Sequence, residues 1–301
     1  MDINQSSSGR VIRSIKGYST FIPNPLPPII KWDNKLVGTL SRADFVLGKL
    51  AREGSKLPNP HLLMRTFLTR EAVLSSKIEG THATIGEMLA HNAGAGVNQD
   101  PADLQEVQNY ITALDFGLNR LDTLPFSLRL IKEIHEKLMH GVRGSHATPG
   151  EFRTSQNWIG SPGCTLNTAK FVPPPAENLA DCLGDFETFL HNRQLPPLIH
   201  IALCHYQFES IHPFLDGNGR VSRLMSYAML RDALDTGGIW SIARGLARNV
   251  ETYKAHLAAC DQPRRNDLDG RGNLSEESLA EFAKFFLKAC IDQVSFMEEL
   301  V

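Results

Sequence analysis

Side chains that could act together on a phosphate stand close to one another between residues 212 and 223. His212 could take a proton from an attacking hydroxyl near neutral pH. Asp216 is a hard oxygen ligand that suits Mg²⁺ beside phosphates. Arg220 and Arg223 lie one helical turn apart, and guanidinium groups bind phosphate oxygens through paired hydrogen bonds. A base, a metal ligand and two cations predict attack on a nucleotide phosphate.

The glycines of the same segment suit it to binding an anion. Pro213 would end the preceding helix, and Gly217 and Gly219 allow a tight turn into the next one. The backbone N–H groups of Gly217, Asn218 and Gly219 would then lie at a helix N-terminus, where a phosphate is favourable. A hairpin turn is the alternative interpretation, but the flanking apolar residues have helical spacing. No Gly-Lys-Ser/Thr run follows a Gly-rich loop, which excludes a Walker-type site.

The segment from His212 to Arg223 reads His-Pro-Phe-x-Asp-Gly-Asn-Gly-Arg-x-x-Arg, which resembles the signature of Fic-domain proteins without a departure. The resemblance implies an all-α fold, namely a Fic-type helical bundle with a short β-hairpin flap. It also implies transfer of AMP from ATP, with Mg²⁺ as cofactor, to a protein hydroxyl. His212 would be the base, Asp216 the metal ligand and Arg220 the group that binds the terminal phosphate. The other predicted nucleotide contacts are Gly217, Asn218, Gly219 and Arg223.

The helix predicted over residues 60–80 carries a second group of polar side chains. Glu71, Ser75 and Glu79 share one face because they are spaced four residues apart. Glu79 stands in the last turn, where a carboxylate opposes the helix dipole. This misfit favours a cationic partner elsewhere in the chain.

Residues 75–80, Ser-Ser-Lys-Ile-Glu-Gly, resemble the inhibitory Ser/Thr-x-x-x-Glu-Gly/Asn motif that precedes some Fic domains. The resemblance implies that Ser75 and Glu79 are inhibitory and that Glu79 pairs with Arg220. ATP would then bind weakly or in an unproductive pose. Breaking a desolvated Arg–Glu pair from one side costs on the order of 3–5 kcal/mol, which is enough to silence an enzyme.

Helical spacing disappears between Pro149 and Pro175, where short extended pieces around a Ser-Pro-Gly turn predict the only β-hairpin. In Fic relatives a hairpin flap at this place positions the target segment by strand addition. The resemblance implies that Ile159 and Gly160 contact the target. An ordinary surface hairpin is the alternative.

The remaining segments are predicted from their local signals. The proline-rich stretch up to residue 30 predicts an extended arm on the protein surface. A short helix is expected over 41–50 with Ser41 as its N-cap. Tyr253 resembles in position an aromatic residue that lies against adenine in Fic relatives. An ordinary half-buried tyrosine is an equal alternative.

The composition limits the partners. The chain has 301 residues with a net charge of −2, so no global basic field would recruit nucleic acid or an anionic membrane. Its five cysteines form no CxxC pair, which is typical of reduced thiols. No signal peptide or segment of membrane-spanning length is recognised. We therefore predict a cytoplasmic protein without direct nucleic-acid or membrane contacts.

We predict an N-terminal helical region with the inhibitory helix (1–95), a Fic core (96–245) and a C-terminal helical extension (246–301). The predicted function is that of a protein adenylyltransferase (AMPylator), autoinhibited by Glu79. Its substrates would be ATP and a Tyr, Thr or Ser hydroxyl of another protein or of itself. The alternatives are a de-AMPylating hydrolase, in which Glu79 aligns a water, and a non-catalytic regulatory or interaction module. A homodimer stays open as an option.

Overall fold

The computed structural model divides into two compact units that interleave along the chain. Four described helices, α1 (Asn34–Gly54), α8 (Asn218–Leu234), α10 (Val250–Asp261) and α11 (Glu276–Glu298), contribute residues to both units. The first unit comprises residues 1–40, 152–218 and 251–287, and the second comprises 41–151, 219–250 and 288–301. The structure describes residues 8–27, 30, 32–54, 56, 60–142, 148–234, 240–261 and 276–298.

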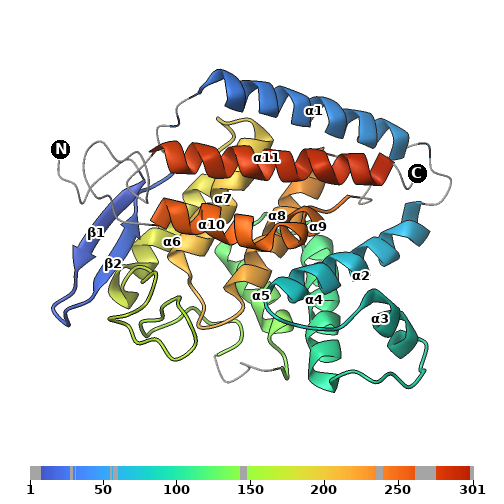
Figure 1. Ribbon diagram of the computed structural model, residues 1–301, viewed down its shortest axis with the longest axis horizontal. Helices are drawn as coiled ribbons and strands as arrows, with labels where there is room; N and C mark the ends of the chain where they lie inside the picture. The colour runs from blue at the N-terminus through green and yellow to red at the C-terminus, as the bar shows by residue number, and fades with distance from the viewer. Residues whose placement is uncertain are drawn as a thin grey trace. The chain divides into compact units, whose positions relative to one another are not determined.

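The first unit contains a β-hairpin that the sequence does not predict. Strands β1 (Gly9–Arg13) and β2 (Ser19–Pro23) pair antiparallel, in the register Gly9↔Pro23 (Figure 1). The prediction of an extended arm is therefore wrong for these residues. Apolar, β-branched and aromatic residues favour a strand here, and the prolines follow only from the end of β2 onwards. Gly17, with φ +91°, supplies the left-handed position of the turn.

The centre of the first unit is helix α7 (Pro197–Ile211). Apolar residues occur all round it, as expected for a helix enclosed on every side. Helix α6 (Leu179–Leu190), preceded by the 3₁₀ turn η1 (Ala176–Asn178), packs on it. The rings of Phe186 and Phe208 meet there at 5.9 Å between centroids. Residues 251–261 of helix α10 also belong to this unit.

The second unit is built around α2 (Pro60–Ile78) and α4 (Pro101–Arg120). Helix α2 also contacts α3 (Ile85–Asn92) and α9 (Ala243–Arg248), while α4 packs against α5 (Leu128–Leu138) (Figure 1). The α4–α5 contact is close at Gly117, where an added Cβ would lie 2.9 Å from Ile134 Cδ1.

The helix end signals in the sequence are largely confirmed. Asp100 Oδ1 accepts a hydrogen bond from Ala102 N at 2.9 Å at the start of α4. Gly80, with φ +98°, ends the α2 segment in the left-handed conformation. The predicted N-cap at Ser41 is wrong, because α1 begins at Asn34 and Asp33 Oδ1 accepts from Leu36 N at 2.7 Å.

A carboxylate is enclosed where α2, α4 and the segment before α9 meet. Glu71 has no exposed surface, and its oxygens accept hydrogen bonds from Tyr110 Oη at 3.0 Å and from Ser241 Oγ. Burial raises the pKa of Glu71 to about 7, although the Tyr110 hydrogen bond and the charge of Arg223 act in the opposite direction. Glu71 therefore titrates near neutral pH.

This pKa predicts a stability that falls as the pH rises. Below the ordinary value of 4.5 the Glu71 carboxyl is protonated in both states, whereas between 4.5 and about 7 it is ionised only in the unfolded chain. Ionisation thus favours unfolding, by roughly 3 kcal/mol once the pH exceeds both values. Glu71→Gln should remove this component of the pH dependence, measured as the free energy of urea unfolding from about pH 5 to about pH 8. Glu177→Gln, at an exposed carboxylate, is the control. Parallel stability curves for wild type and Glu71→Gln would contradict the assignment.

Candidate active site

His212 occupies an unusual backbone conformation at the C-terminal end of α7. It has φ 48° and ψ 59°, the left-handed region, and Pro213 prevents the helix from continuing. The imidazole Nδ1 lies 3.2 Å from the main-chain oxygen of Glu209. A carbonyl oxygen can only accept, so Nδ1 carries the hydrogen of the neutral ring and Nε2 is the basic nitrogen. With 18% of the side chain exposed, the ring is suited to accept a proton.

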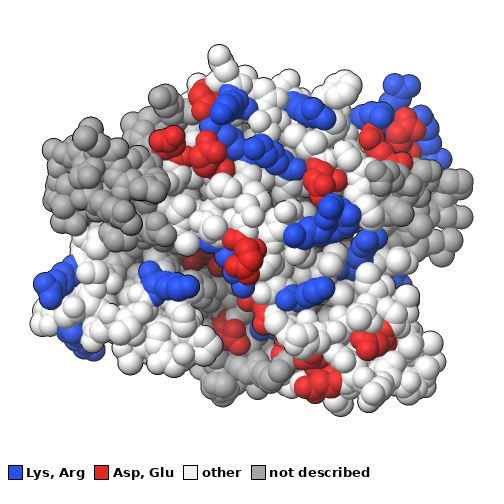
Figure 2. Space-filling view, viewed as in Figure 1, with Lys and Arg blue, Asp and Glu red and all other residues white. Residues whose placement is uncertain are grey.

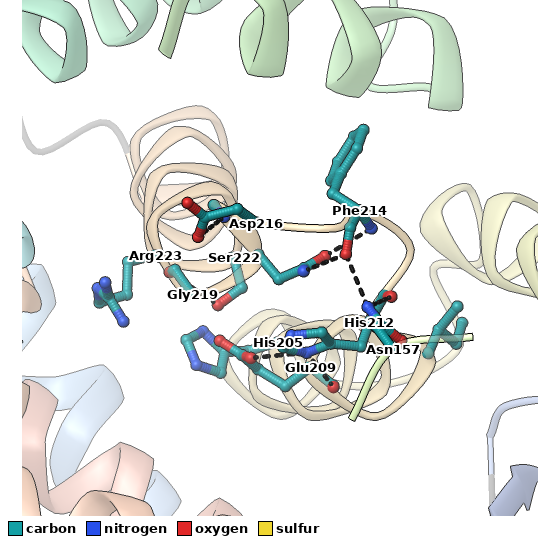
Figure 3. A network of polar contacts seen from close by, with 12 residues as sticks. Asn157, His205, Glu209, His212, Phe214, Asp216, Gly219, Ser222 and Arg223 are labelled. Carbon is teal, nitrogen blue, oxygen red and sulfur yellow. Dashed lines mark hydrogen bonds and ion pairs between the residues drawn. The ribbon is translucent and has the colours of Figure 1, made fainter. Parts of the chain in front are cut away.

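The loop after His212 is closed by Asn218. Its Oδ1 accepts from Phe214 N at 2.9 Å and its Nδ2 donates to Phe214 O at 2.8 Å, as Figure 3 shows for the loop. The Asn218 side chain thus holds the loop, and the predicted phosphate contact could come only from its backbone N–H. Gly217 N donates to Asp216 Oδ1 at 2.7 Å, so this N–H is also directed within the loop.

Asp216 presents an exposed carboxylate that fits a Mg²⁺ ion brought by a nucleotide. Mg²⁺ is commonly bound by one or two carboxylates together with substrate phosphates and water. Among the residues that the structure describes, no group of three or more His, Cys, Asp or Glu side chains could hold a metal. The donor set therefore fits a metal that shares its ligands with phosphates rather than one held by protein alone.

In the second unit, both predicted inhibitory residues contact Arg223. The Arg223 side chain is 1% exposed, and its Nη2 forms an ion pair with Glu79 Oε1 at 2.6 Å. Its Nε donates to Ser75 Oγ at 2.8 Å and its Nη2 donates to Ser75 O at 3.1 Å. The spacing of four residues on α2 brings Ser75 and Glu79 to the same guanidinium.

The Glu79 carboxylate also lies against the first turn of α8. A Cβ added at Gly219 would collide with Glu79 Oε1 and would lie 3.1 Å from Arg223 Nη1. The N-terminal end of a helix carries partial positive charge and favours an anion. Glu79 thus occupies, as a carboxylate, a position at which a phosphate would be favourable.

Arg220 faces a different carboxylate. Its Nη1 lies 3.4 Å from Glu106 Oε2 on α4, and both side chains are less than 10% exposed. Thr81 Oγ1, just beyond the α2 segment, donates to the same Glu106 oxygen at 3.1 Å. The predicted partner of Glu79 is Arg220, whereas an ion pair in the structure joins Glu79 to Arg223. Glu106 is absent from the predicted site because no local signal distinguishes it from other charged residues of an amphipathic helix.

The predicted flap contains a minimal strand pair. Ile159 N donates to Phe171 O at 2.9 Å, and Ile159 O accepts from Lys170 N at 2.9 Å. Alternate residues of a strand direct their main-chain groups to opposite edges. Ile159 therefore pairs within the flap, and the main-chain groups of Trp158 and Gly160 are directed to the outer edge. Contact of Ile159 and Gly160 with a target stays a prediction; the Ile159 side chain is 40% exposed.

Tyr253 lies inside the first unit. It is 2% exposed, its Oη lies 2.6 Å from His205 Nε2, and its ring stacks on Phe285 at 6.4 Å between centroids. This position agrees with the alternative interpretation, in which Tyr253 is an ordinary tyrosine packed within the protein. Stacking on adenine stays a prediction that would require the ring to leave these neighbours.

The surface matches the small net charge. Acidic and basic side chains are interspersed on the face shown in Figure 2, without a large area of one sign. Within the described ranges, no helix combines the length and the apolar character that crossing a bilayer requires.

Comparison with protein families gives two adjacent matches. The family described as "Fic/DOC family N-terminal" matches residues 37–119, and that described as "Fic/DOC family" matches residues 125–230. The second region contains the loop of His212 and both arginines, and the first contains Ser75 and Glu79.

The relatives in sequence are only distantly similar. The protein adenylyltransferase Fic of Drosophila virilis is 33% identical over 136 residues, which are 42% of this chain and 25% of that protein. The protein of the same name from Aedes aegypti is 34% identical over 136 residues, 43% of this chain and 24% of its own length. The match thus spans about a quarter of these relatives.

Solved structures share the fold over most of the chain. A Fic family protein from Desulfovibrio desulfuricans has a TM-score of 0.73 at 24% identity, covering 91% of this chain and 77% of that one. Fic-1 from C. elegans has a TM-score of 0.64 at 19% identity, with coverages of 88% and 73%. The helical architecture is therefore common to these proteins.

The two carboxylate–arginine pairs should differ in their contribution to stability. Glu106→Gln should cost on the order of 3 kcal/mol, because it removes a nearly enclosed carboxylate that faces the buried Arg220 charge. Glu79→Gln should cost less, about 1–2 kcal/mol, because solvent reaches this carboxylate and can partly compensate the Arg223 charge when it is removed; the Glu79 side chain is 39% exposed. Urea unfolding of the two isosteric variants measures the difference. Equal losses would show that burial does not separate the pairs.

Proposed function

Because the chain belongs to the Fic/DOC family, we propose that it is a protein adenylyltransferase that moves AMP from ATP to a Tyr, Thr or Ser hydroxyl of a protein. We further propose that Glu79 holds the enzyme inactive. The observation that carries this proposal is the Glu79 carboxylate at the first turn of α8, 2.6 Å from Arg223. An anion held by an arginine at a helix N-terminus supports a site for phosphate, and its origin in the same chain supports autoinhibition.

In the proposed reaction, the acceptor oxygen bonds to the α-phosphorus of ATP while the bond to the bridging oxygen of pyrophosphate breaks. The hydroxyl proton passes to Nε2 of His212, whose other ring nitrogen is oriented by Glu209 O. Arg220 and Arg223 bind the oxygens of the departing pyrophosphate, which becomes more negative as it leaves. Release of Glu79 is needed first, because its carboxylate occupies one of these guanidinium groups.

Asp216 is the residue that would hold the Mg²⁺ accompanying ATP. When bound, such an ion neutralises negative charge on the phosphates. The carboxylate is exposed, and the hydrogen bond from Gly217 N orients it. The names of the Drosophila virilis and Aedes aegypti relatives support AMP as the transferred group.

The acceptor would be presented by the flap. The outer edge at Trp158 and Gly160 supports binding of an extended segment through main-chain hydrogen bonds. Exposed apolar side chains accompany this edge in the first unit: Trp158 at 43%, Ile159 at 40% and Leu215, in the loop itself, at 39%. Main-chain recognition with a few apolar contacts suits an acceptor selected by shape, either another protein or a segment of this chain.

Removal of AMP from a modified protein is a second candidate. The observation that favours it is the 39% exposure of the Glu79 side chain, which lets the carboxylate reach water beside the phosphate position. Glu79 would then align a water molecule for attack. Release of free AMP from an AMP-modified protein would distinguish this activity from transfer.

Glu79→Gly should raise AMP transfer about tenfold or more, since each 1.4 kcal/mol of lost pairing is worth a factor of ten. Incorporation of labelled AMP from ATP and Mg²⁺ into the protein itself measures the gain. Lys77→Gly is the matched control, because it places a glycine at an exposed position of the same final turn without touching Arg223. An equal gain in both variants would attribute activation to a loosened helix end, and no gain in Glu79→Gly would refute the inhibitory role.

His212→Ala, made together with Glu79→Gly, should lower the transfer rate by about 10²–10⁴, the usual contribution of a general base. ATP binding, measured by calorimetry, should change little because the imidazole acts on the acceptor proton. Transfer at the level of Glu79→Gly alone would rule out His212 as the base.

A further inference from the structure

The main chain of the catalytic loop is held by the segment that leads into the flap. Arg153 is 3% exposed, and its backbone N–H donates to Pro213 O at 2.8 Å. Its Nε donates to His212 O at 2.9 Å, and its Nη2 approaches Ile211 O at 3.4 Å. Burial lowers the pKa of Arg153 to about 10, so the guanidinium is still charged at neutral pH.

Asn157 continues the same set of contacts. Its Nδ2 donates to Phe214 O at 2.8 Å and approaches His212 O at 3.3 Å (Figure 3). The carbonyls of residues 211–214 therefore all accept from Arg153 or Asn157. Both donors belong to the irregular segment that leads to Ile159 in the flap.

The same arginine also holds the returning arm of the flap. Its Nη2 donates to Pro174 O at 2.6 Å and its Nη1 donates to Ser155 O at 3.1 Å. The returning arm is supported from behind by β2, where Phe21 N donates to Val172 O at 3.0 Å. Arg153 thus joins the base of the flap to the loop that carries His212.

These contacts explain how His212 keeps its backbone conformation. A non-glycine residue with φ near +48° is disfavoured and persists where its surroundings fix it. Hydrogen bonds from a charged donor are stronger than neutral ones, and two side chains approach the His212 carbonyl. The peptide that follows the imidazole-bearing residue is therefore restrained from the flap side.

We propose that Arg153 and Asn157 are positioning residues that fix His212 to the base of the flap, so that the acceptor-binding strand and the base move as one body. This inference rests on the proposed function. An acceptor segment paired at Trp158 and Gly160 then lies on the same rigid piece as the imidazole that takes its proton. Such an arrangement sets the distance between acceptor and base before ATP arrives.

Asn157→Ala in the Glu79→Gly background tests the coupling. We expect kcat for AMP transfer to fall about 10–100-fold, since a shift of about 1 Å in a catalytic group can cost that much. The KM for ATP should stay within about twofold, because Asn157 acts on the side of the base. Asn157→Asp, which keeps the side-chain shape and removes the donor, should reproduce the effect if the alanine variant folds poorly.

Gln156→Ala is the matched control. Gln156 carries a similar amide on the neighbouring residue, and its Nε2 donates to Asn157 O and Pro173 O, both outside the catalytic loop. We expect kcat within about twofold of the parent. A loss of kcat equal to that of Asn157→Ala would overturn the proposal, because general loosening of the flap would then explain both.

Amide hydrogen exchange provides a readout that does not need transfer activity. Asn157→Ala should speed exchange of the amides in residues 212–217 by on the order of tenfold, whereas Gln156→Ala should affect only residues 158–172. Unchanged exchange over 212–217 in both Asn157 variants would refute the coupling. If exchange changes as expected while no variant transfers AMP, the positioning role stands and the proposed reaction fails.

Discussion

The buried guanidinium of Arg223 requires an anion. A charge that is 99% enclosed is costly unless a carboxylate or phosphate compensates it, and Glu79 supplies the carboxylate at 2.6 Å. The contact with Arg223 favours helical order in the last turns of α2, because both Ser75 and Glu79 reach the Arg223 guanidinium. A nucleotide that displaces Glu79 would meet a site whose charge is already arranged for it, so little reorganisation would be needed.

Two further carboxylates of the second unit, Glu71 and Glu106, are more deeply buried than Glu79. Glu106 faces Arg220 in a nearly enclosed position, while Glu71 lies deeper and has a pKa near 7. Glu71 is spaced four residues from Ser75 and adds its own field at Arg223, since that charge lowers its pKa. Along this face of α2 the exposure of the carboxyl groups increases from Glu71, which is buried, to Glu79, which solvent reaches. Under the proposed function, the Glu79 contact could therefore break while the hydrogen bonds of Glu71 stay in place.

Much of the site could be predicted because its residues are adjacent in sequence. The loop from His212 to Gly219 fixes its own geometry through short-range contacts such as Asn218 with Phe214. Spacing of four residues likewise placed Ser75 and Glu79 together correctly. The ion pair between Glu79 and Arg223 depends on packing between distant segments, which no local pattern encodes. Glu106 and Arg153 act through contacts between distant segments, so they gave no recognisable signal.

The errors in the fold have similar causes. Prolines at the end of β2 and beyond it suggested an extended arm, but the residues before them pair as β1 and β2 and pack against Val172. At α1, Asp33 caps the helix at a point where the apolar pattern is too weak to mark a start. Tyr253 is not such an error, because its half-apolar side chain suits a ligand face or an interior equally well and the sequence left both open. Tertiary packing decided each of these cases.

The close approach of the Glu79 carboxylate to Gly219 restricts which residues this position of α8 can accept. Because Gly219 has no side chain, the Glu79 carboxylate fits against it. Any larger residue would displace this carboxylate and would also reduce the space for a phosphate at the same place. Under the proposed function, inhibition by Glu79 and binding of the nucleotide phosphates therefore depend on the same space beside Gly219. Under the proposed function, a substitution at Gly219 would remove the inhibitory contact and weaken nucleotide binding together, whereas a substitution of Glu79, just after α2, would remove only the inhibitory contact.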